Sequence, residues 1–506
     1  MTAGTGSTTT VASTLEQIGL GLPGRHDGVL LTGGAVLTLD DSFTIHDPGW
    51  VLVHGATIAN VGAGDPPAAI RKAAERVVDT TGSVVMPGMV NAHTHLFQTF
   101  FRGLADDKSL LDWLHQCIWP GAIHMDAETT QIAALLGMVE NLRGGATGIL
   151  DHQYIHADPE IDSAVLAAAE QVGVRYLLAR GWADRNYEPT LSEPVDTVLA
   201  RFNDLHQQWD GVDDGRLRVE NGPLIPWGCS DDAMRATIQQ AAKLGVGMHI
   251  HCAETKAEVE MSLEERALRH VPWLASLDAL GPYTQLAHGV WLDDSEIDTI
   301  ARSGAVVVHC PVSNMYLASG VPRILDMIER GVTVALASDG PGSNNRQDMF
   351  EVLKATALLQ KVDRLDPVAI QPEQVLRMAC QGGAAALRQP PTADRPMTAH
   401  QMGVAEGRFG EPPDPDHRLG EVTPGARADL LVVKLASVFT TPVHRIPSAL
   451  VFSAPAAAVS HVFVDGRVLI DQGELTMVDE AALLAVATKT ASEVFRRAQI
   501  ETRLTR

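Results

Sequence analysis

Residues 84–95 read VVMPGMVNAHTH, an apolar stretch that ends in two histidines, His93 and His95. The stretch predicts a buried β-strand. Because side chains alternate between the two faces of a strand, both imidazoles project to the same side, where they can bind one metal ion. A His-x-His pair alone is weak evidence, since backbone carbonyls and solvent also satisfy paired histidines at a strand end.

Three later stretches also place a polar side chain after an apolar run. Residues 247–254, GMHIHCAE, contain His251 with Glu254 three residues beyond it. Residues 285–289, QLAHG, contain His288, and Asp339 lies near the end of VTVALASDG, residues 332–340. Neutral imidazoles and a carboxylate suit a divalent transition metal, zinc by default or iron, with one coordination position left for water.

Strand-like and helix-like segments alternate across the middle of the chain. After residues 84–95, strand-like runs begin near residues 145, 174, 217, 246, 284, 305 and 332, and the stretches between them have helical spacing and caps, such as Asp126 before residues 127–143. About eight strand-helix repeats predict an α/β fold, a (β/α)8 barrel of the TIM type. Catalytic groups of such barrels lie at the strand ends, where all of the candidates fall, namely His93, His95, His251, His288 and Asp339.

The two ends of the chain have a different pattern. Short β-rich runs separated by turns occupy residues 28–78 and recur near the C-terminus, so strands from both ends are expected to pair in one small β-sandwich domain. We therefore predict a flexible arm at 1–27, the first part of the sandwich at 28–83, a metal-dependent hydrolase barrel at 84–420, the second part of the sandwich at 421–480 and a C-terminal helix at 481–506. A Pro-rich segment at 389–424 is expected to be an exposed linker.

The composition restricts the partners and the location. Lys and Arg total 39 against 62 Asp and Glu, a formal net charge of −23, which disfavours binding to nucleic acid polymers and to anionic membranes. The 5 cysteines are scattered and suit buried free thiols, so we expect a cytoplasmic protein. No signal-peptide pattern is present, and no apolar run approaches the roughly 18 residues of a membrane span.

The candidate site also contains acids and bases. Water bound to a metal ionises near neutral pH, so no serine or cysteine nucleophile is needed. Glu254 is our candidate general acid and base, although an acid there also caps helices in many proteins. His288 is expected to polarise the substrate or to be a core histidine, and Asp339 to bind the metal, accept a proton or cap a turn. His249 and His309 are equally open between structural and functional roles.

From about residue 28 to residue 474, the chain resembles the amidohydrolase superfamily, in its mononuclear metal-dependent aminohydrolase (deaminase) branch. The matching motifs are PGMVNAHTH, HCAET, LAHG, HCPVSN and SDG, and residues 221–227, NGPLIPW, lack the lysine of two-metal sites. The resemblance implies one divalent ion, Zn2+ or Fe2+, and a homo-oligomer, commonly a homodimer. By the same resemblance the metal ligands are His93, His95, His251 and Asp339, and the catalytic residues are Glu254, His288 and Asp339.

The implied reaction is hydrolytic deamination of an amino-substituted N-heterocycle, such as a purine, a pterin or an s-triazine, by metal-bound hydroxide with release of ammonia or amine. Motifs similar to oxoguanine deaminases and hydroxyatrazine aminohydrolases occur beside others similar to S-adenosylhomocysteine deaminases, so the ring stays open. Gln98, Trp113 and Tyr154 are candidates to contact it, against a packing role for each. The alternatives are hydrolysis of a cyclic amide or of a non-amine leaving group, and a non-catalytic scaffold of the same fold.

Overall fold

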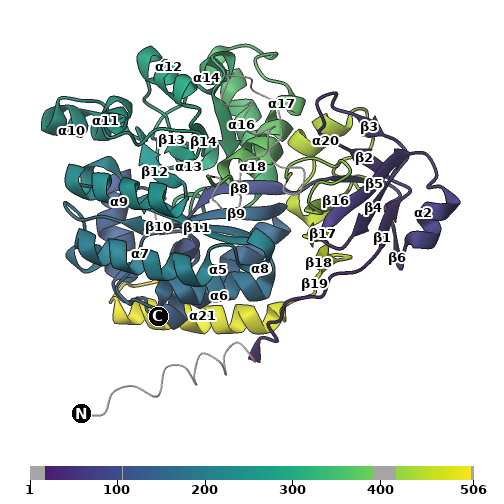
Figure 1. Cartoon of the computed structure of the whole chain (residues 1–506), viewed down its shortest axis with the longest axis horizontal. Helices are drawn as coiled ribbons and strands as arrows, with labels where there is room; N and C mark the ends of the chain where they lie inside the picture. The colour runs from purple at the N-terminus through teal and green to yellow at the C-terminus, as the bar shows by residue number, and fades with distance from the viewer. Residues whose placement is uncertain (1–16, 105, 391–417, 503–506) are drawn as a thin grey trace.

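The computed structural model describes residues 17–104, 106–390 and 418–502. In this part of the chain an eight-stranded parallel sheet comes from the middle of the sequence, and a four-stranded and a seven-stranded sheet come mainly from its two ends (Figure 1). The predicted fold class, a TIM-type barrel with a small β-sandwich from both ends of the chain, is confirmed.

The barrel strands follow one another in chain order, each parallel to the next, and they are almost wholly buried. Burial on both faces explains why these segments read as continuous apolar runs. The ring closes between its last and first strands, where Asp339 N donates to the His93 carbonyl at 3.1 Å. The strands are β8 (Met89–Thr94), β9 (Ala146–Gln153), β10 (Arg175–Trp182), β11 (Leu217–Pro223), β12 (Met248–Cys252), β13 (Thr284–His288), β14 (Val306–His309) and β15 (Thr333–Leu336).

Helices surround the barrel (Figure 1). The first long helix begins where predicted, because the Asp126 carboxylate accepts a hydrogen bond from Thr129 N at 3.0 Å. The next begins at Ile161, and Asp158, which precedes it, accepts at Oδ2 from Ala127 N at 3.0 Å. The longer helices are α5 (Ala127–Arg143), α6 (Ile161–Val172), α7 (Val195–Trp209), α9 (Asp231–Leu244), α10 (Lys256–Arg266), α11 (His270–Ser276), α12 (Asp294–Ser303), α14 (Ile324–Glu329), α16 (Met349–Arg364) and α17 (Pro372–Arg377).

Shorter helical segments complete the connections. Those that follow β8, β14 and β15 are η1 (Leu96–Phe101), α3 (Leu110–Trp113), η2 (Leu114–Ile118), α4 (Trp119–Ala122), α13 (Pro311–Tyr316) and α15 (Pro341–Asn344). Elsewhere they are α2 (Ala68–Ala73), η3 (Pro189–Leu191), α8 (Val212–Gly215), η4 (Pro226–Gly228), η5 (Met378–Gly382), α18 (Gly383–Ala386), α20 (Ile446–Phe452) and η7 (Ala456–Ala458).

The two smaller sheets pack face to face through a shared valine-rich core that contains Val29 and Val51 from one and Val85 and Val432 from the other. A hairpin turn at Asp465-Gly466, with φ of 48° and 71°, joins β17 to β18. One sheet contains β1 (Val29–Thr32), β4 (Gly49–His54), β5 (Thr57–Ala63) and β6 (Arg76–Asp79). The other contains β2 (Ala35–Leu37), β3 (Ile45–His46), β7 (Ser83–Pro87), β16 (Leu430–Lys434), β17 (Val459–Val464), β18 (Arg467–Asp471) and β19 (Glu474–Leu475).

Residues 84–95 form two strands, not the single strand that their apolar composition predicted. β7 pairs with β16 in the seven-stranded sheet, whereas β8 pairs with β9 in the barrel. Gly88 joins them, and a Cβ there would lie 2.0 Å from Thr147 Oγ1, so a larger residue would not fit. β8 ends at Thr94, and His95 is the first residue beyond it.

The remaining predictions concern the chain ends. Residues 1–16 of the predicted arm, 391–417 of the predicted linker and 503–506 of the predicted C-terminal helix lie outside the described residues. The described part of that helix is α21 (Glu480–Arg497), which is tied to α5 by a 2.9 Å hydrogen bond from Arg143 Nε to Glu480 Oε1. The division into domains stays a prediction. No described helix is both long and apolar enough to cross a bilayer.

Candidate metal centre and active site

Three imidazoles and a carboxylate meet at the ends of the barrel strands. His95 Nε2 lies 3.3 Å from His251 Nε2, and the His93 ring centroid lies 4.7 Å from that of His95 and 4.8 Å from that of His251. Asp339, just beyond β15, places Oδ1 3.5 Å from His93 Nε2 and 3.4 Å from His95 Nε2. All four side chains are buried. The structure therefore brings together the four residues that the resemblance associates with a metal.

Backbone contacts fix which ring nitrogens face this shared space. His95 Nδ1 donates to the His152 carbonyl at 2.7 Å, and His251 Nδ1 donates to the Leu224 carbonyl at 2.6 Å. Since a carbonyl oxygen only accepts, each Nδ1 carries the proton and each Nε2 presents a lone pair. Lone pairs and a carboxylate oxygen at this separation repel one another unless a cation lies between them.

The spacing of these donor atoms can be compared with that around a tetrahedral ion. Ligands at about 2.0–2.1 Å from such an ion lie about 3.3–3.4 Å from one another. His95 Nε2 lies 3.3 Å from His251 Nε2 and 3.4 Å from Asp339 Oδ1, and His93 Nε2 lies 3.5 Å from Asp339 Oδ1. His93 Nε2 is buried without a hydrogen-bond partner among the described residues. The donor set therefore fits an ion of the size of zinc.

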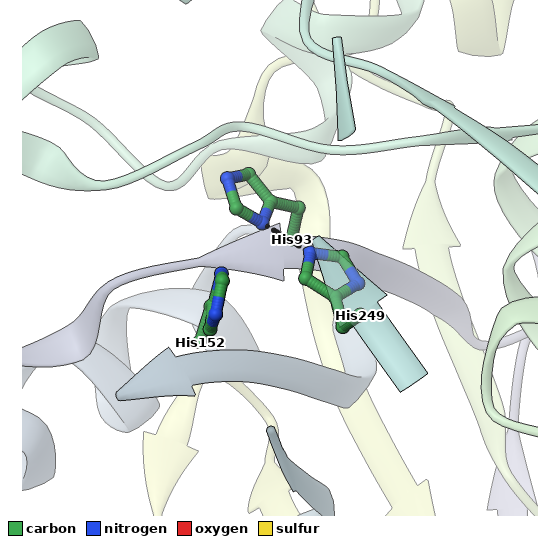
Figure 2. A group of neighbouring side chains, drawn as sticks. All are labelled: His93, His152 and His249. Atoms are coloured by element: carbon green, nitrogen blue, oxygen red, sulfur yellow. Dashed lines mark hydrogen bonds between the residues drawn. The ribbon is translucent and has the colours of Figure 1, made fainter. Parts of the chain in front are cut away.

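A further pair of imidazoles lies next to His93 (Figure 2). His93 Nδ1 lies 2.7 Å from His249 Nε2, the two rings stack at 4.9 Å, and His152 completes the group. A separation of 2.7 Å is that of a hydrogen bond and is too short for two ligands of one tetrahedral ion, which lie about 3.3 Å apart. His249 therefore orients His93. His309 is buried, and neither of its ring nitrogens has a partner in the described chain.

Glu254 is buried beside His288, with Oε2 3.4 Å from His288 Nε2. Burial raises the pKa of Glu254 well above its usual value, which favours the protonated form of the carboxyl group. The alternative role, capping α10, belongs to two other residues. Thr255 N donates to Glu258 Oε2 at 2.9 Å and Glu258 N donates to Thr255 Oγ1 at 3.3 Å. Glu254 is thus free of the cap and faces the site.

His288 and Asp339 are both held by residues of α13. His288 Nδ1 donates to Asn314 Oδ1 at 3.0 Å, a side-chain partner instead of the backbone partner expected of a core histidine. Asp339 Oδ2 accepts from Ser313 Oγ at 2.6 Å. Although burial raises the pKa of Asp339, the imidazoles of His95 and His288 bring it below the usual value, so this carboxylate stays ionised.

The candidate ring-binding residues lie on one side of this group. The centroid of the Tyr154 ring lies 4.9 Å from that of the His95 ring, edge to face. The Tyr154 hydroxyl accepts a hydrogen bond from Gln98 Nε2 at 2.8 Å. Gln98 Oε1 packs against Gly340, where an added Cβ would lie 2.1 Å from it. Among the described residues, neither Gln98 Oε1 nor Trp113 Nε1 has a hydrogen-bond partner, and both atoms are buried.

Sequence reasoning gave no role to Ser313 or Asn314, although it included both in the HCPVSN motif. Serine and asparagine are common in loops, and no spacing marks these two. It also missed the Leu224 carbonyl, because a backbone acceptor leaves no signal in the sequence. The sequence leaves the role of His249 open between structure and function, and its 2.7 Å contact with His93 Nδ1 indicates that it orients this ring.

Comparisons with known proteins identify the family and the fold. Residues 84–392 match the Amidohydrolase family. The 5'-deoxyadenosine deaminase of Methanosarcina mazei is 34% identical over 469 residues, which cover 93% of this chain and 99% of that protein. The 5-methylthioadenosine/S-adenosylhomocysteine deaminase of Haloquadratum walsbyi is 34% identical over 479 residues, 93% of this chain and 98% of that protein. A solved adenosine deaminase from Xanthomonas campestris with bound zinc has a TM-score of 0.81 at 30% identity, over 94% of this chain and 100% of that one.

Proposed function

This chain belongs to the amidohydrolase family and is a metal-dependent hydrolytic deaminase of an N-heterocycle, and on that premise we propose that its substrate is a 6-aminopurine nucleoside. Its relatives are named for 5'-deoxyadenosine, 5-methylthioadenosine and S-adenosylhomocysteine, and a structural neighbour for adenosine. These compounds share an adenine with an exocyclic amine, and they differ at the 5' position of the ribose. We propose that the enzyme removes this amine and tolerates variation at the 5' position.

The proposed cofactor is one zinc ion held by His93, His95, His251 and Asp339. The support is the 3.3–3.5 Å spacing of their donor atoms and the carbonyl contacts that direct two of the Nε2 atoms inward. Burial lowers the pKa of His251 to about 3 and also lowers that of His95, so the imidazoles stay neutral and able to ligate. When bound, such an ion acidifies water and polarises the group under attack.

The proposed roles of the protein side chains follow from their protonation. Glu254, whose pKa is raised by burial, is the proposed donor of a proton to the substrate and regains one from the attacking water. Asp339 is ionised and is a second proton acceptor, and His288, with Nε2 3.4 Å from Glu254 Oε2, takes part in this exchange. The oxygen of water ends on the ring carbon, and its two protons end on the ring nitrogen and on the departing ammonia.

The observation that carries this proposal is the buried Glu254 carboxyl group, 3.4 Å from His288 Nε2, beside a buried set of converging metal donors. The test is an ammonia assay with zinc-loaded protein and a panel of adenosine, 5'-deoxyadenosine, 5'-methylthioadenosine, S-adenosylhomocysteine, guanine and a pterin. We expect ammonia and a hypoxanthine-type product from the nucleosides. Absence of ammonia from every nucleoside, with one zinc per chain, would refute the proposed substrate class.

Gln98 supports a second candidate substrate, an aminated oxopurine. Its buried Oε1 is an acceptor that finds no donor among the described residues. The ring nitrogens of adenine are acceptors, whereas a guanine-type ring presents N–H donors to such an oxygen. Faster turnover of guanine than of adenosine in the same panel would favour this candidate. Rotation of the amide, which exchanges Oε1 and Nε2, would instead suit adenine.

A homodimer and a cytoplasmic location are also proposals. The cysteines Cys117, Cys229, Cys252, Cys310 and Cys380 are buried and unpaired, in agreement with a reducing compartment. Light scattering of the purified protein measures its mass, and a monomer mass at micromolar concentration would contradict the dimer.

A further inference from the structure

One short segment contacts three of the proposed active-site residues. This segment, which we call the α13 segment, comprises residues 311–319, with α13 and the turn after it. Each of three side chains in it forms one hydrogen bond to one site residue. The pairs are Ser313 Oγ to Asp339 Oδ2 at 2.6 Å, His288 Nδ1 to Asn314 Oδ1 at 3.0 Å and Ser319 Oγ to Glu254 Oε1 at 3.3 Å.

Two of these site residues, and the residue before the third, have unusual backbone geometry. His288 has φ of 72° and Asp339 has φ of 66°, and Ala253, directly before Glu254, has φ of 50°. Residues with a Cβ rarely adopt this left-handed conformation, and it persists where the surroundings hold it. Every left-handed strand end at the site thus has one hydrogen-bonded partner in the α13 segment, either on that residue or on the next one.

The α13 segment is itself anchored at its outer end. Asn345 Nδ2, in the connection after β15, donates to the Tyr316 hydroxyl at 3.1 Å, and that hydroxyl bonds to Asp106 in the connection after β8. At the other end Asn314 N donates to the Cys310 carbonyl at 3.0 Å, which fixes the first turn to β14. The segment, which itself follows β14, is therefore also held by the connections after β8 and β15.

Within this segment Asn314 has a specific chemical effect. An amide oxygen only accepts, so the proton of a neutral His288 lies on Nδ1 and the lone pair on Nε2. That Nε2 is buried without a hydrogen bond in the described structure and lies 3.4 Å from Glu254 Oε2. Asn314 thereby selects which ring nitrogen His288 presents to the reacting groups.

We propose that Asn314 is a positioning residue that fixes the tautomer and orientation of His288. Ser313 and Ser319 orient the carboxyl groups of Asp339 and Glu254 through their hydrogen bonds. The α13 segment thus aligns three strand ends that lie far apart in the sequence. The kinetic part of its test rests on the proposed deaminase function, and the spectroscopic part does not.

The variants that test this are Asn314→Ala, which removes the acceptor, and Asn314→Asp, which keeps an acceptor oxygen. The matched control is Gln131→Ala, because Gln131 is also a buried amide but donates to the Ala164 carbonyl, between α5 and α6, at 2.8 Å. We expect Asn314→Ala to lower kcat by about 10-fold to 100-fold with KM within about threefold of wild type. Asn314→Asp should retain more activity than Asn314→Ala, and every variant should hold one zinc per chain.

The second readout is the 15N spectrum of histidine-labelled protein, with the His288 signals assigned by their loss in His288→Gln. We expect an Nδ1-protonated ring in wild type and a loss of that preference in Asn314→Ala but not in Gln131→Ala. An Nε2-protonated His288 in wild type, or a kcat for Asn314→Ala no lower than for Gln131→Ala, would overturn the proposal. If wild type deaminates nothing in the panel, the proposed function fails while the spectrum still tests Asn314.

Discussion

His93 Nδ1 lies 2.7 Å from His249 Nε2, so a histidine of β8 is oriented by a histidine of β12. If His93 Nε2 ligates an ion, its Nδ1 carries the proton and donates it to His249. The contact thus couples the direction of a proposed ligand to a residue that does not itself reach the ion.

Replacement of His249 by alanine should weaken zinc binding by about 10-fold to 100-fold, the usual effect of losing a partner behind a metal ligand. The measurement is competition with a chromophoric chelator. His309→Ala is the matched control, because His309 is equally buried but neither ring nitrogen has a partner among the described residues. Equal affinities for the two variants would contradict the role of His249.

Replacement of Glu254 by glutamine should lower kcat by about a thousandfold while zinc content stays at one per chain, since the amide cannot transfer the proton. Thr255→Ala is the comparison, because Thr255 caps α10 one residue away. That variant should lose about 1 kcal/mol of unfolding free energy and keep most of its kcat. If Thr255→Ala were the less active of the two, the roles would be reversed.

Removal of the metal should affect both activity and stability. A chelator should abolish ammonia release, and zinc at 1,000 times its Kd should restore it and stabilise the fold by about 4 kcal/mol. Thermal unfolding of the metal-free and zinc-loaded protein measures the difference. An unchanged midpoint, together with activity that survives the chelator, would show that the four donor atoms hold no catalytic ion.

Replacement of Gln98 by methionine, which has a similar size, should raise KM for the amino-heterocycle by about tenfold, because the amide at Gly340 is lost. The control is Gln131→Met, which replaces another buried side-chain amide that bonds to the Ala164 carbonyl, remote from the site. Unchanged KM in Gln98→Met would assign this side chain to packing alone.

The free energy of unfolding should depend on pH because the Glu220 carboxyl group is buried. Burial raises the pKa of this β11 carboxyl group to about 8 in the folded chain, above its value in the unfolded chain, although Gln389 donates to it. The folded state therefore binds a proton that the unfolded state releases, and stability falls as the pH rises from about 5 to about 8. Glu220→Gln should match wild type near pH 5 and exceed it at pH 8, as measured by denaturant unfolding. Parallel curves for both proteins would contradict this.

The barrel could be predicted from the sequence because its strands are buried on both faces and read as apolar runs, as in residues 305–308, and because turns and caps such as Asp126 punctuate them. The position of His93, His95, His251 and Asp339 at strand ends followed from the same pattern. The break at Gly88 was not predicted, because the run stays apolar through Pro87 into Val90.

The contacts of Asn314 and of the Leu224 carbonyl could not be predicted for a different reason. Each depends on how a loop of one strand meets a side chain of another strand, and the partners are 26 and 27 residues apart in the chain. Nothing in the residue types records such a pairing. Only the three-dimensional arrangement distinguishes Asn314 from an ordinary loop asparagine.

The passage from β7 through Gly88 into β8 also has a consequence for synthesis on the ribosome. β7, directly before the strand that carries His93, pairs with β16, which is made almost 350 residues later, at Leu430–Lys434. A nascent chain that stops before β16 contains all four proposed zinc ligands but lacks one of the two strands that flank β7, since only β2 has been made by then. Zinc acquisition during translation should therefore wait until the C-terminal strands emerge.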